Sequence, residues 1–312
     1  MTSFAFVFPG QGSQSVGMLD AWGDHPAVVQ TLDEASAALG SDLRALIHDG
    51  PKETLDLTTH TQPVMLAAGI ACYRAWLAET GQVPAVVAGH SLGEYTALVA
   101  AGTLTLADAL PLVRFRAQAM QEAVPVGAGA MAAILGLDAN AVVAGCAEVA
   151  AASGEVVAAA NFNDPKQTVI AGTKAGVDQA CVALKALGAK RVLPLAVSAP
   201  FHCSLMKPAA DRLRERLADV AIAPPTIPVV NNVDVLCEDD PQRIRDALYR
   251  QAFGPVRWVE VVHAIRRRGI GHILECGPGR ALAGIVKRVD GEVVVGNVLD
   301  PETLAESRAL LA

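Results

Sequence analysis

The sequence predicts an α/β protein, with a core built on a parallel β-sheet and a smaller ferredoxin-like (βαββαβ) subdomain inserted into it. Three observations lead to this fold class. Short apolar runs alternate with helical segments near both ends of the chain, a serine stands between two glycines where a strand meets a helix, and the order of elements changes between residues 127 and 197.

The core strands are expected at three short apolar runs, at residues 4–8, within residues 83–89 and at residues 272–276. A glycine-containing loop or turn follows each run, and helices are expected at residues 95–101, 106–122 and 280–288. The second helix starts after Thr105, which has the spacing of a helix cap with Asp108. This alternation of strands and helices is typical of a parallel sheet.

The inserted segment has its own regular order of elements. It is predicted to form a strand at 130–135, a helix at 138–151, strands at 156–161 and 168–171, a helix at 175–187 and a strand at 191–195. That is the βαββαβ order of a ferredoxin-like unit. The predicted boundaries are therefore 1–126 and 198–312 for the large subdomain and 127–197 for the small one.

Composition excludes several classes of partner. The 312 residues are 52% apolar and carry a net charge of −7, so the chain can bury a large core but has no overall basic field for nucleic acid or an anionic membrane. Residues 4–9 end in a proline and lack a basic start, unlike a signal peptide, and no apolar run approaches the roughly 18 residues of a membrane span. The six cysteines are scattered without metal-binding spacing, which predicts reduced thiols in a cytoplasmic protein and no metal site.

Ser91 lies at a predicted nucleophile elbow. The residues before it predict a buried strand and those after it a packed helix, while Gly89 and Gly93 leave room where a sharp turn brings backbone segments together. Such a turn exposes the serine at a helix N-terminus, where free N–H groups and the helix dipole favour a developing oxyanion. The pattern predicts a nucleophilic serine.

A nucleophilic serine needs a base, and His202 is the preferred candidate among seven histidines. It lies where the chain returns from the inserted subdomain, a position that can present a side chain to a cleft between the subdomains. His90, next to the serine, is expected to form a wall of the pocket. The spacing leaves open whether Asp234 or Asp164 orients the base.

Two further segments border the expected site. The loop 10–14 follows the first strand and lacks the spacing of a phosphate or dinucleotide loop, but it can aim a backbone N–H at an oxyanion. Arg114 and Arg116 are about 200° apart around a helix, so at most one of them faces a pocket. Pro111 in the same helix makes its phase uncertain.

Taken together, these segments resemble the malonyl-CoA:acyl-carrier-protein transacylases of fatty-acid synthesis. The resemblance extends over essentially the whole chain and depends on separated motifs in the same order: FPGQGSQ at 8–14, GHSLGEY at 89–95, GAMAA at 129–133, NFN at 161–163, PFH at 200–202, VVNN at 229–232 and GPG at 277–279. In this family the core is hydrolase-like and carries a ferredoxin-like insertion, which agrees with the fold predicted above.

The resemblance implies a role for each site residue. Ser91 is the acylated nucleophile, His202 its base, and the backbone carbonyl of Gln251 orients that base. The N–H groups of Gln11 and Leu92 form the oxyanion hole, and Arg116 holds the malonyl carboxylate while Arg114 faces outward. The acyl and pantetheine path is lined by Gln62, Met120, Met131 and Asn163, and Phe201 restricts the space beside the malonyl α-carbon.

The implied function is transfer of malonyl from malonyl-CoA to the phosphopantetheine thiol of acyl-carrier protein by a ping-pong mechanism, with no cofactor. A thioesterase or ester hydrolase of the same fold is the first alternative, which an Asp orienting His202 would favour. A non-catalytic module that binds a carrier protein is the second. An acidic carrier needs a local basic surface, for which the candidates are Lys190, Arg191, Lys287 and Arg288.

Overall fold

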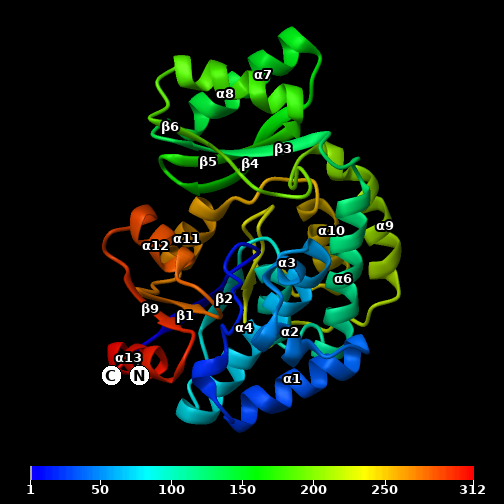
Figure 1. Cartoon of the computed structure of the whole chain (residues 1–312). Coiled ribbons are helices and arrows are strands. Elements are labelled where there is room, and N and C mark those ends of the chain that lie inside the picture. The colour runs from blue at the N-terminus through cyan, green and yellow to red at the C-terminus, as the bar shows by residue number, and fades with distance from the viewer. Residues whose placement is uncertain (1) are drawn as a thin grey trace.

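Two β-sheets of different kinds form the framework of the computed structural model, which describes residues 2–312 (Figure 1). Met1, the first residue of the predicted large subdomain, lies outside the described residues. The larger sheet is parallel, with strand order β7-β2-β1-β8-β9, and the smaller sheet is antiparallel, with order β4-β5-β3-β6. The α/β fold class predicted from the sequence is confirmed.

The parallel sheet consists of β1 (Phe4–Phe8), β2 (Val86–Gly89), β7 (Val229–Val230), β8 (His272–Cys276) and β9 (Val294–Val298). Its helices are α1 (Pro26–Leu39), α2 (Leu43–Asp49), α3 (Lys52–Leu55), α4 (Thr58–Thr80), α5 (Gly93–Ala100), α6 (Leu106–Glu122), α9 (Lys207–Ala218), α10 (Pro241–Gln251), α11 (Trp258–Arg267), α12 (Ala281–Val289) and α13 (Pro301–Leu310). Two short 3₁₀ turns lie at Asp20–Trp22 and Ser204–Met206.

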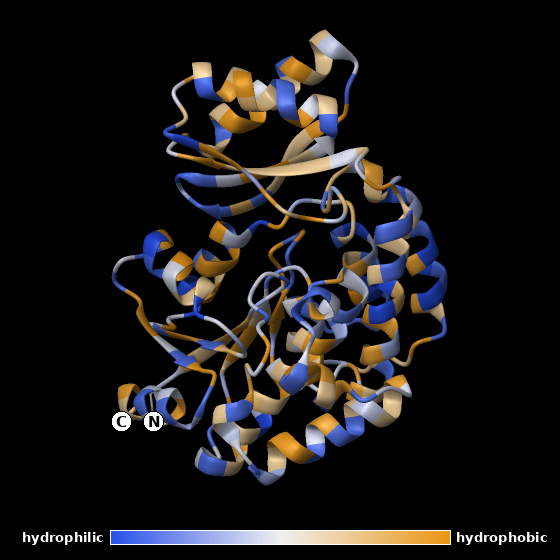
Figure 2. Cartoon of the chain, viewed as in Figure 1, coloured by the Kyte–Doolittle hydropathy of each residue, from blue (hydrophilic) through white to orange (hydrophobic). Residues whose placement is uncertain are grey.

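The central strand β1 is buried on both faces, which is why all five of its residues are apolar. Phe4, Phe6 and Phe8 point into the larger core beneath α1, α4 and α6, whereas Ala5 and Val7 point into a second core beneath α11 and α12. The sheet is thus covered by helices on both faces. In Figure 2 the central strands are mainly hydrophobic, and the outer helix α9 carries many hydrophilic residues.

The antiparallel sheet consists of β3 (Gly129–Leu135), β4 (Val157–Asp164), β5 (Gln167–Thr173) and β6 (Arg191–Pro194), with α7 (Ala139–Ser153) and α8 (Lys174–Ala186) on one face. Alternation along β3 divides its residues between the two faces: Ala132 and Ile134 pack beneath these helices, while Met131 and Ala133 pack on the opposite side with Cys203. That opposite face is turned toward the parallel sheet (Figure 1).

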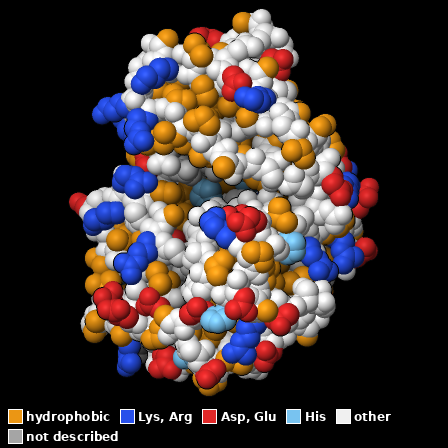
Figure 3. Space-filling view, viewed as in Figure 1, with side chains coloured by type: hydrophobic (Ala, Val, Ile, Leu, Met, Phe, Trp, Pro, Cys, Tyr) orange, Lys and Arg blue, Asp and Glu red, His pale blue; other side chains and the backbone are white. Residues whose placement is uncertain are grey.

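The carboxyl ends of β1 and β2 lie side by side beneath this face, because Phe8 is in register with Gly89. The loops that follow these two strands therefore meet between the two sheets, where ligands bind in open α/β folds. Figure 3 shows a hollow at this position, with a histidine at its base.

Candidate active site

Ser91 occupies a sharp turn between β2 and α5. Its backbone has a positive φ of 52°, which is uncommon for a residue with a side chain. A Cβ on Gly89 would lie 1.8 Å from the carbonyl carbon of Gly93, and one on Gly93 would lie 2.1 Å from the carbonyl oxygen of Phe8. Only glycine fits at either position, which is the physical reason for the Gly-x-Ser-x-Gly pattern of the sequence.

Asn232, which follows β7, holds this strained turn from the outside. Its Oδ1 accepts a hydrogen bond from the Ser91 N–H at 2.8 Å, and its Nδ2 donates to the carbonyl oxygen of Gly89 at 2.8 Å. The residue is fully buried. Sequence reasoning assigned it no role, since nothing in a linear pattern shows that a residue 141 positions away closes the turn.

His202 lies against the serine. Its Nε2 is 2.6 Å from Ser91 Oγ, and its Nδ1 is 2.9 Å from the carbonyl oxygen of Gln251 and 3.2 Å from that of Gly254. Because a carbonyl only accepts hydrogen bonds, Nδ1 carries the proton and Nε2 is free to accept one from the serine. The tautomer is therefore the one that a general base requires.

Neither aspartate that the sequence left open orients this histidine. Asp234 pairs with Arg250 through two contacts of 2.7 and 2.6 Å, and Asp164 pairs with Arg288 at 2.7 Å. The imidazole is thus held by two neutral carbonyls. Burial, followed by the charge of Arg116, lowers the pKa of His202 to about 3.

Arg116 is buried beside the nucleophile. Helix α6 runs without interruption through Pro111, from its cap at Thr105, and it turns Arg116 inward while Arg114 donates to the carbonyl oxygen of Leu39. Within residues 2–312, the hydrogen-bond partners of Arg116 are all neutral: Gln62 Oε1 at 2.8 Å, Gln251 Oε1 at 2.9 Å and Ser91 Oγ at 3.3 Å. Its Nε is buried and has none.

The backbone N–H groups of Gln11 and Leu92 are the oxyanion donors expected from the sequence. Both residues line the same cavity, and neither N–H donates to an acceptor within the described chain. Leu92 immediately precedes α5, so its N–H lies at the start of that helix. Two unused donors beside a nucleophile can stabilise an oxyanion.

A cavity of about 500 Å³ opens onto these groups between the two sheets. Eight of the predicted site residues line it: Gln11, Gln62, Ser91, Leu92, Arg116, Met131, Phe201 and His202. His90 also lines it, as expected. Sequence analysis assigned no role to the other lining residues, among them Lys52, Asp56, Leu195, Val197 and Asn161, although Asn161 belongs to the NFN motif at 161–163.

Three predicted site residues are not part of the cavity wall. Met120 is packed in the core beneath the parallel sheet, and Asn163 accepts a hydrogen bond from His90 Nε2 at 2.9 Å. Gln251 is completely buried behind Arg116 and acts from there on both Arg116 and His202. Met120 and Asn163 thus lie one layer behind the expected path.

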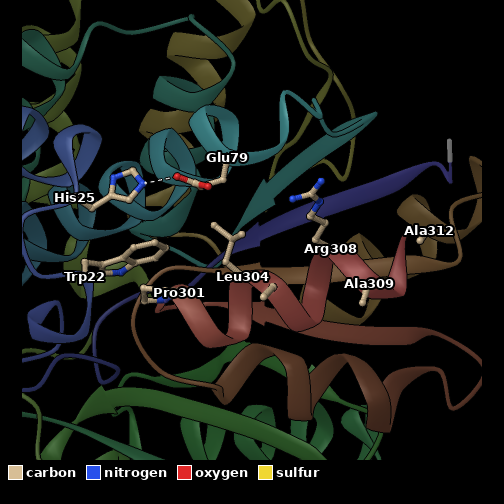
Figure 4. Close-up of a pocket in the computed structure, with 9 residues that line it drawn as sticks. Trp22, His25, Glu79, Pro301, Leu304, Arg308, Ala309 and Ala312 are labelled. Carbon is tan, nitrogen blue, oxygen red and sulfur yellow. Dashed lines mark hydrogen bonds and ion pairs between the residues drawn. The ribbon is translucent and has the colours of Figure 1, made fainter.

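A second cavity, of about 590 Å³, lies at the far end of the molecule, where α13 packs near the end of α4 (Figure 4). Trp22, Leu304 and Arg308 line it, together with the hydrogen-bonded pair His25 and Glu79. No serine or cysteine is among its lining residues.

In residues 2–312 no group of histidine, cysteine and acidic side chains is arranged to hold a metal, and no helix is long and apolar enough to cross a membrane.

Comparisons with known proteins find acyl transferases that are similar to this chain over most of its length. The family model described as "Acyl transferase domain" matches residues 5–288. Malonyl CoA-acyl carrier protein transacylase of Escherichia coli (strain K12) is 53% identical over 99% of this chain and 100% of its own length. The crystal structure of acyl-carrier-protein S-malonyltransferase from Burkholderia pseudomallei 1710b is 63% identical, with a TM-score of 0.96 over 98% of this chain and 99% of that one.

A second solved structure includes a partner. A type II PKS acyl-carrier protein has been solved in complex with its malonyl-transacylase, which is 50% identical to this chain. The TM-score is 0.96, over 98% of this chain and 99% of that one.

Proposed function

This chain belongs to the acyl transferase family, among the malonyl-CoA:acyl-carrier-protein transacylases, and we propose that it transfers malonyl from malonyl-CoA to the phosphopantetheine thiol of an acyl-carrier protein. The product supplies fatty-acid chain elongation. The reaction proceeds through a malonyl ester on Ser91, with no cofactor beyond the two substrates. The 2.6 Å contact between Ser91 Oγ and His202 Nε2 supports this proposal most directly.

In the first half-reaction, His202 Nε2 takes the proton of Ser91 as Oγ attacks the thioester carbonyl carbon of malonyl-CoA. The carbonyl oxygen becomes an oxyanion, for which the N–H groups of Gln11 and Leu92 are the proposed donors. The C–S bond then breaks, and the CoA sulfur leaves with the proton from His202. The enzyme now carries malonyl as an oxygen ester.

The second half-reaction runs the same steps in reverse order. The carrier thiol gives its proton to His202, and its sulfur attacks the ester carbonyl carbon. The bond to Ser91 Oγ breaks, and the oxygen recovers a proton from His202. A thioester is formed for each one consumed, so the transfer needs no external energy source.

Arg116 is the proposed binding group for the malonyl carboxylate. A guanidinium has five N–H donors, and its three hydrogen bonds to protein leave two of them, Nε–H and one on Nη1, without a partner in the described residues. Its planar fork matches a carboxylate. A buried cation with spare donors next to the nucleophile favours an acyl group with a free carboxylate.

The remaining cavity residues are assigned to the acyl and pantetheine path. Gln62 holds Arg116, and Met131 and Phe201 give apolar walls on the side of the small sheet.

The candidates for docking of the acidic carrier remain Lys190, Arg191, Lys287 and Arg288. Basic side chains stand beside the hollow in Figure 3. All six cysteines are free thiols, which supports the proposed cytoplasmic location.

The experiment that tests this function supplies labelled malonyl-CoA together with a carrier protein bearing phosphopantetheine. Wild-type enzyme should move the label to the carrier, and Ser91→Ala should not. Free malonate as the main product, with little labelled carrier, would instead identify a hydrolase. A carrier that binds but is not acylated would identify a non-catalytic module.

A further inference from the structure

Arg116 is a buried cation without a direct anionic partner. Its side chain is 2% exposed, and its hydrogen-bond partners in residues 2–312 are two amides and a hydroxyl. The Tyr95 ring lies 5.4 Å from its guanidinium carbon, which adds a weak cation–π contact. Burial of an uncompensated charge is costly, so an anion nearby is expected to balance it.

The buried carboxyl group whose charge acts on Arg116 belongs to Glu94, on the first turn of α5. It is also 2% exposed. Its Oε2 accepts from the backbone N–H of Asn232 at 2.9 Å and from Gln251 Nε2 at 3.2 Å, and within the described residues it forms no ion pair with a basic side chain. Glu94 is therefore a second buried ionisable group with neutral partners only.

The side-chain amide of Gln251 connects the two groups. Its oxygen accepts from Arg116 Nη2 at 2.9 Å, and its nitrogen donates to Glu94 Oε2 and, at 2.8 Å, to the carbonyl oxygen of Ser91. Cation, amide and carboxyl group thus form a chain directly behind the nucleophile. The amide is neutral, so any offset of the guanidinium charge comes from the carboxyl group beyond it, which makes no direct contact with the guanidinium donors.

We propose that Glu94 is the counter-charge of Arg116, coupled to it through Gln251, and that its ionisation sets how strongly the site prefers an acyl group with a carboxylate over one without. This inference rests on the proposed malonyl transfer. Ionised Glu94 offsets the positive potential of Arg116 and weakens its attraction for malonyl. Protonated Glu94 leaves that potential undiminished.

The direction of the pH effect follows from the surroundings of Glu94. Burial raises its pKa to about 7, with Asn232, Gln251 and the charge of Arg116 opposing the rise. The other ionisable groups that face it are Tyr95 on its own helix and Asp234 and Glu238 on the loop after β7. The pKa of Asp234 is lowered by Arg250 and that of Tyr95 is raised to about 12, so neither titrates near neutrality.

Preference for malonyl should therefore fall as pH rises through about 7. The measurement is the ratio of kcat/KM for malonyl-CoA to that for acetyl-CoA, from about pH 5.5 to about pH 8.5. Titration of His202 or of a thiol affects both donors alike and cancels in the ratio. We expect a decrease of about threefold or more, the order expected for separated charges in a protein interior.

Glu94→Gln should remove this pH dependence and hold the ratio at the high value that wild type has at low pH. The matched control is Glu275→Gln. Glu275 is also completely buried, burial also raises its pKa to about 7, and it lies on β8, which β1 separates from β2. The control variant should keep the wild-type slope.

Two results would overturn the proposal while leaving the malonyl-transfer assignment intact. One is a ratio that does not change with pH in the wild-type enzyme. This measurement does not depend on whether any variant folds. The other is an unchanged slope in Glu94→Gln. Failure of Ser91 to become acylated at all would contradict the proposed function instead.

Discussion

Ser91 and His202, whose reacting atoms lie 2.6 Å apart, both have left-handed backbone conformations, with φ of 52° and 61°. Such conformations cost about 1–3 kcal/mol each for residues with a side chain and persist only where the surroundings enforce them. The two hydrogen bonds of Asn232 enforce the conformation of Ser91. The conformation of His202 is accompanied by the contacts of its Nδ1 with two carbonyl oxygens. Strain at both partners aims their side chains at each other.

The tight packing of the turn predicts a large effect of Gly89→Ala. Its Cβ would lie 1.8 Å from the backbone of Gly93, so the variant should lose about 3 kcal/mol of unfolding free energy or fail to fold. The control is Gly291→Ala, where a Cβ meets no atom within 4 Å and the change should stay within about 0.5 kcal/mol. Urea denaturation measures both; a stable Gly89→Ala protein would contradict the packing argument.

His202 should remain an active base well below its usual pH range. An unperturbed imidazole has a pKa of about 6.5, but burial and the charge of Arg116 lower the pKa of His202 to about 3. The neutral form then persists on acidification. Acylation of Ser91 by acetyl-CoA, which avoids the carboxylate effect of Glu94, should change little between about pH 7.5 and 5.5, whereas a pKa of 6.5 would cost about tenfold. Rapid-quench mass spectrometry distinguishes the two.

Arg116→Ala should lower kcat/KM for malonyl-CoA by at least about tenfold, because a hydrogen bond between charged partners contributes about 1.5–3 kcal/mol. Acetyl-CoA has no carboxylate and should be retained as a donor. Arg114→Ala is the control, since this residue lies two positions away on α6 and, within residues 2–312, its side chain donates only to the Leu39 carbonyl. Equal losses for both donors in Arg116→Ala would show a structural role and contradict carboxylate binding.

Phe201→Ser should relax selection against methylmalonyl-CoA. Phe201 lines the cavity immediately before the base, and one methyl group is worth about 1–3 kcal/mol of discrimination. The variant should therefore use both donors at more similar rates while still transferring malonyl. Competition between the two donors measures this directly, and a wild-type enzyme that accepts them equally would refute the idea.

The sequence predicted the strands and helices closely where local signals are strong. Residues 4–8, 106–122 and 272–276 have the predicted bounds, since apolar runs and a helix cap are properties of neighbouring residues. Pro111 left the phase of its helix uncertain, and the structure shows that the helix continues with Arg116 inward. Along the chain, the small subdomain has the predicted βαββαβ order of elements.

Contacts between distant segments could not be predicted in the same way. Asn232 and the side chain of Gln251 reach Ser91 from 141 and 160 positions away, and no periodicity records such distances. Met120 is one turn beyond Arg116 on α6, yet it is packed in the core. Which side chains form the first layer around a cavity depends on packing between elements, and only the folded chain shows it.

The most direct test of the account is the intact mass of the protein after brief exposure to malonyl-CoA without a carrier thiol. We expect wild type to gain one malonyl group, and we expect peptide mapping to place it on Ser91. Ser91→Ala should gain none. An unchanged mass for wild type, or the same gain in Ser91→Ala, would contradict transfer through a malonyl ester on this serine.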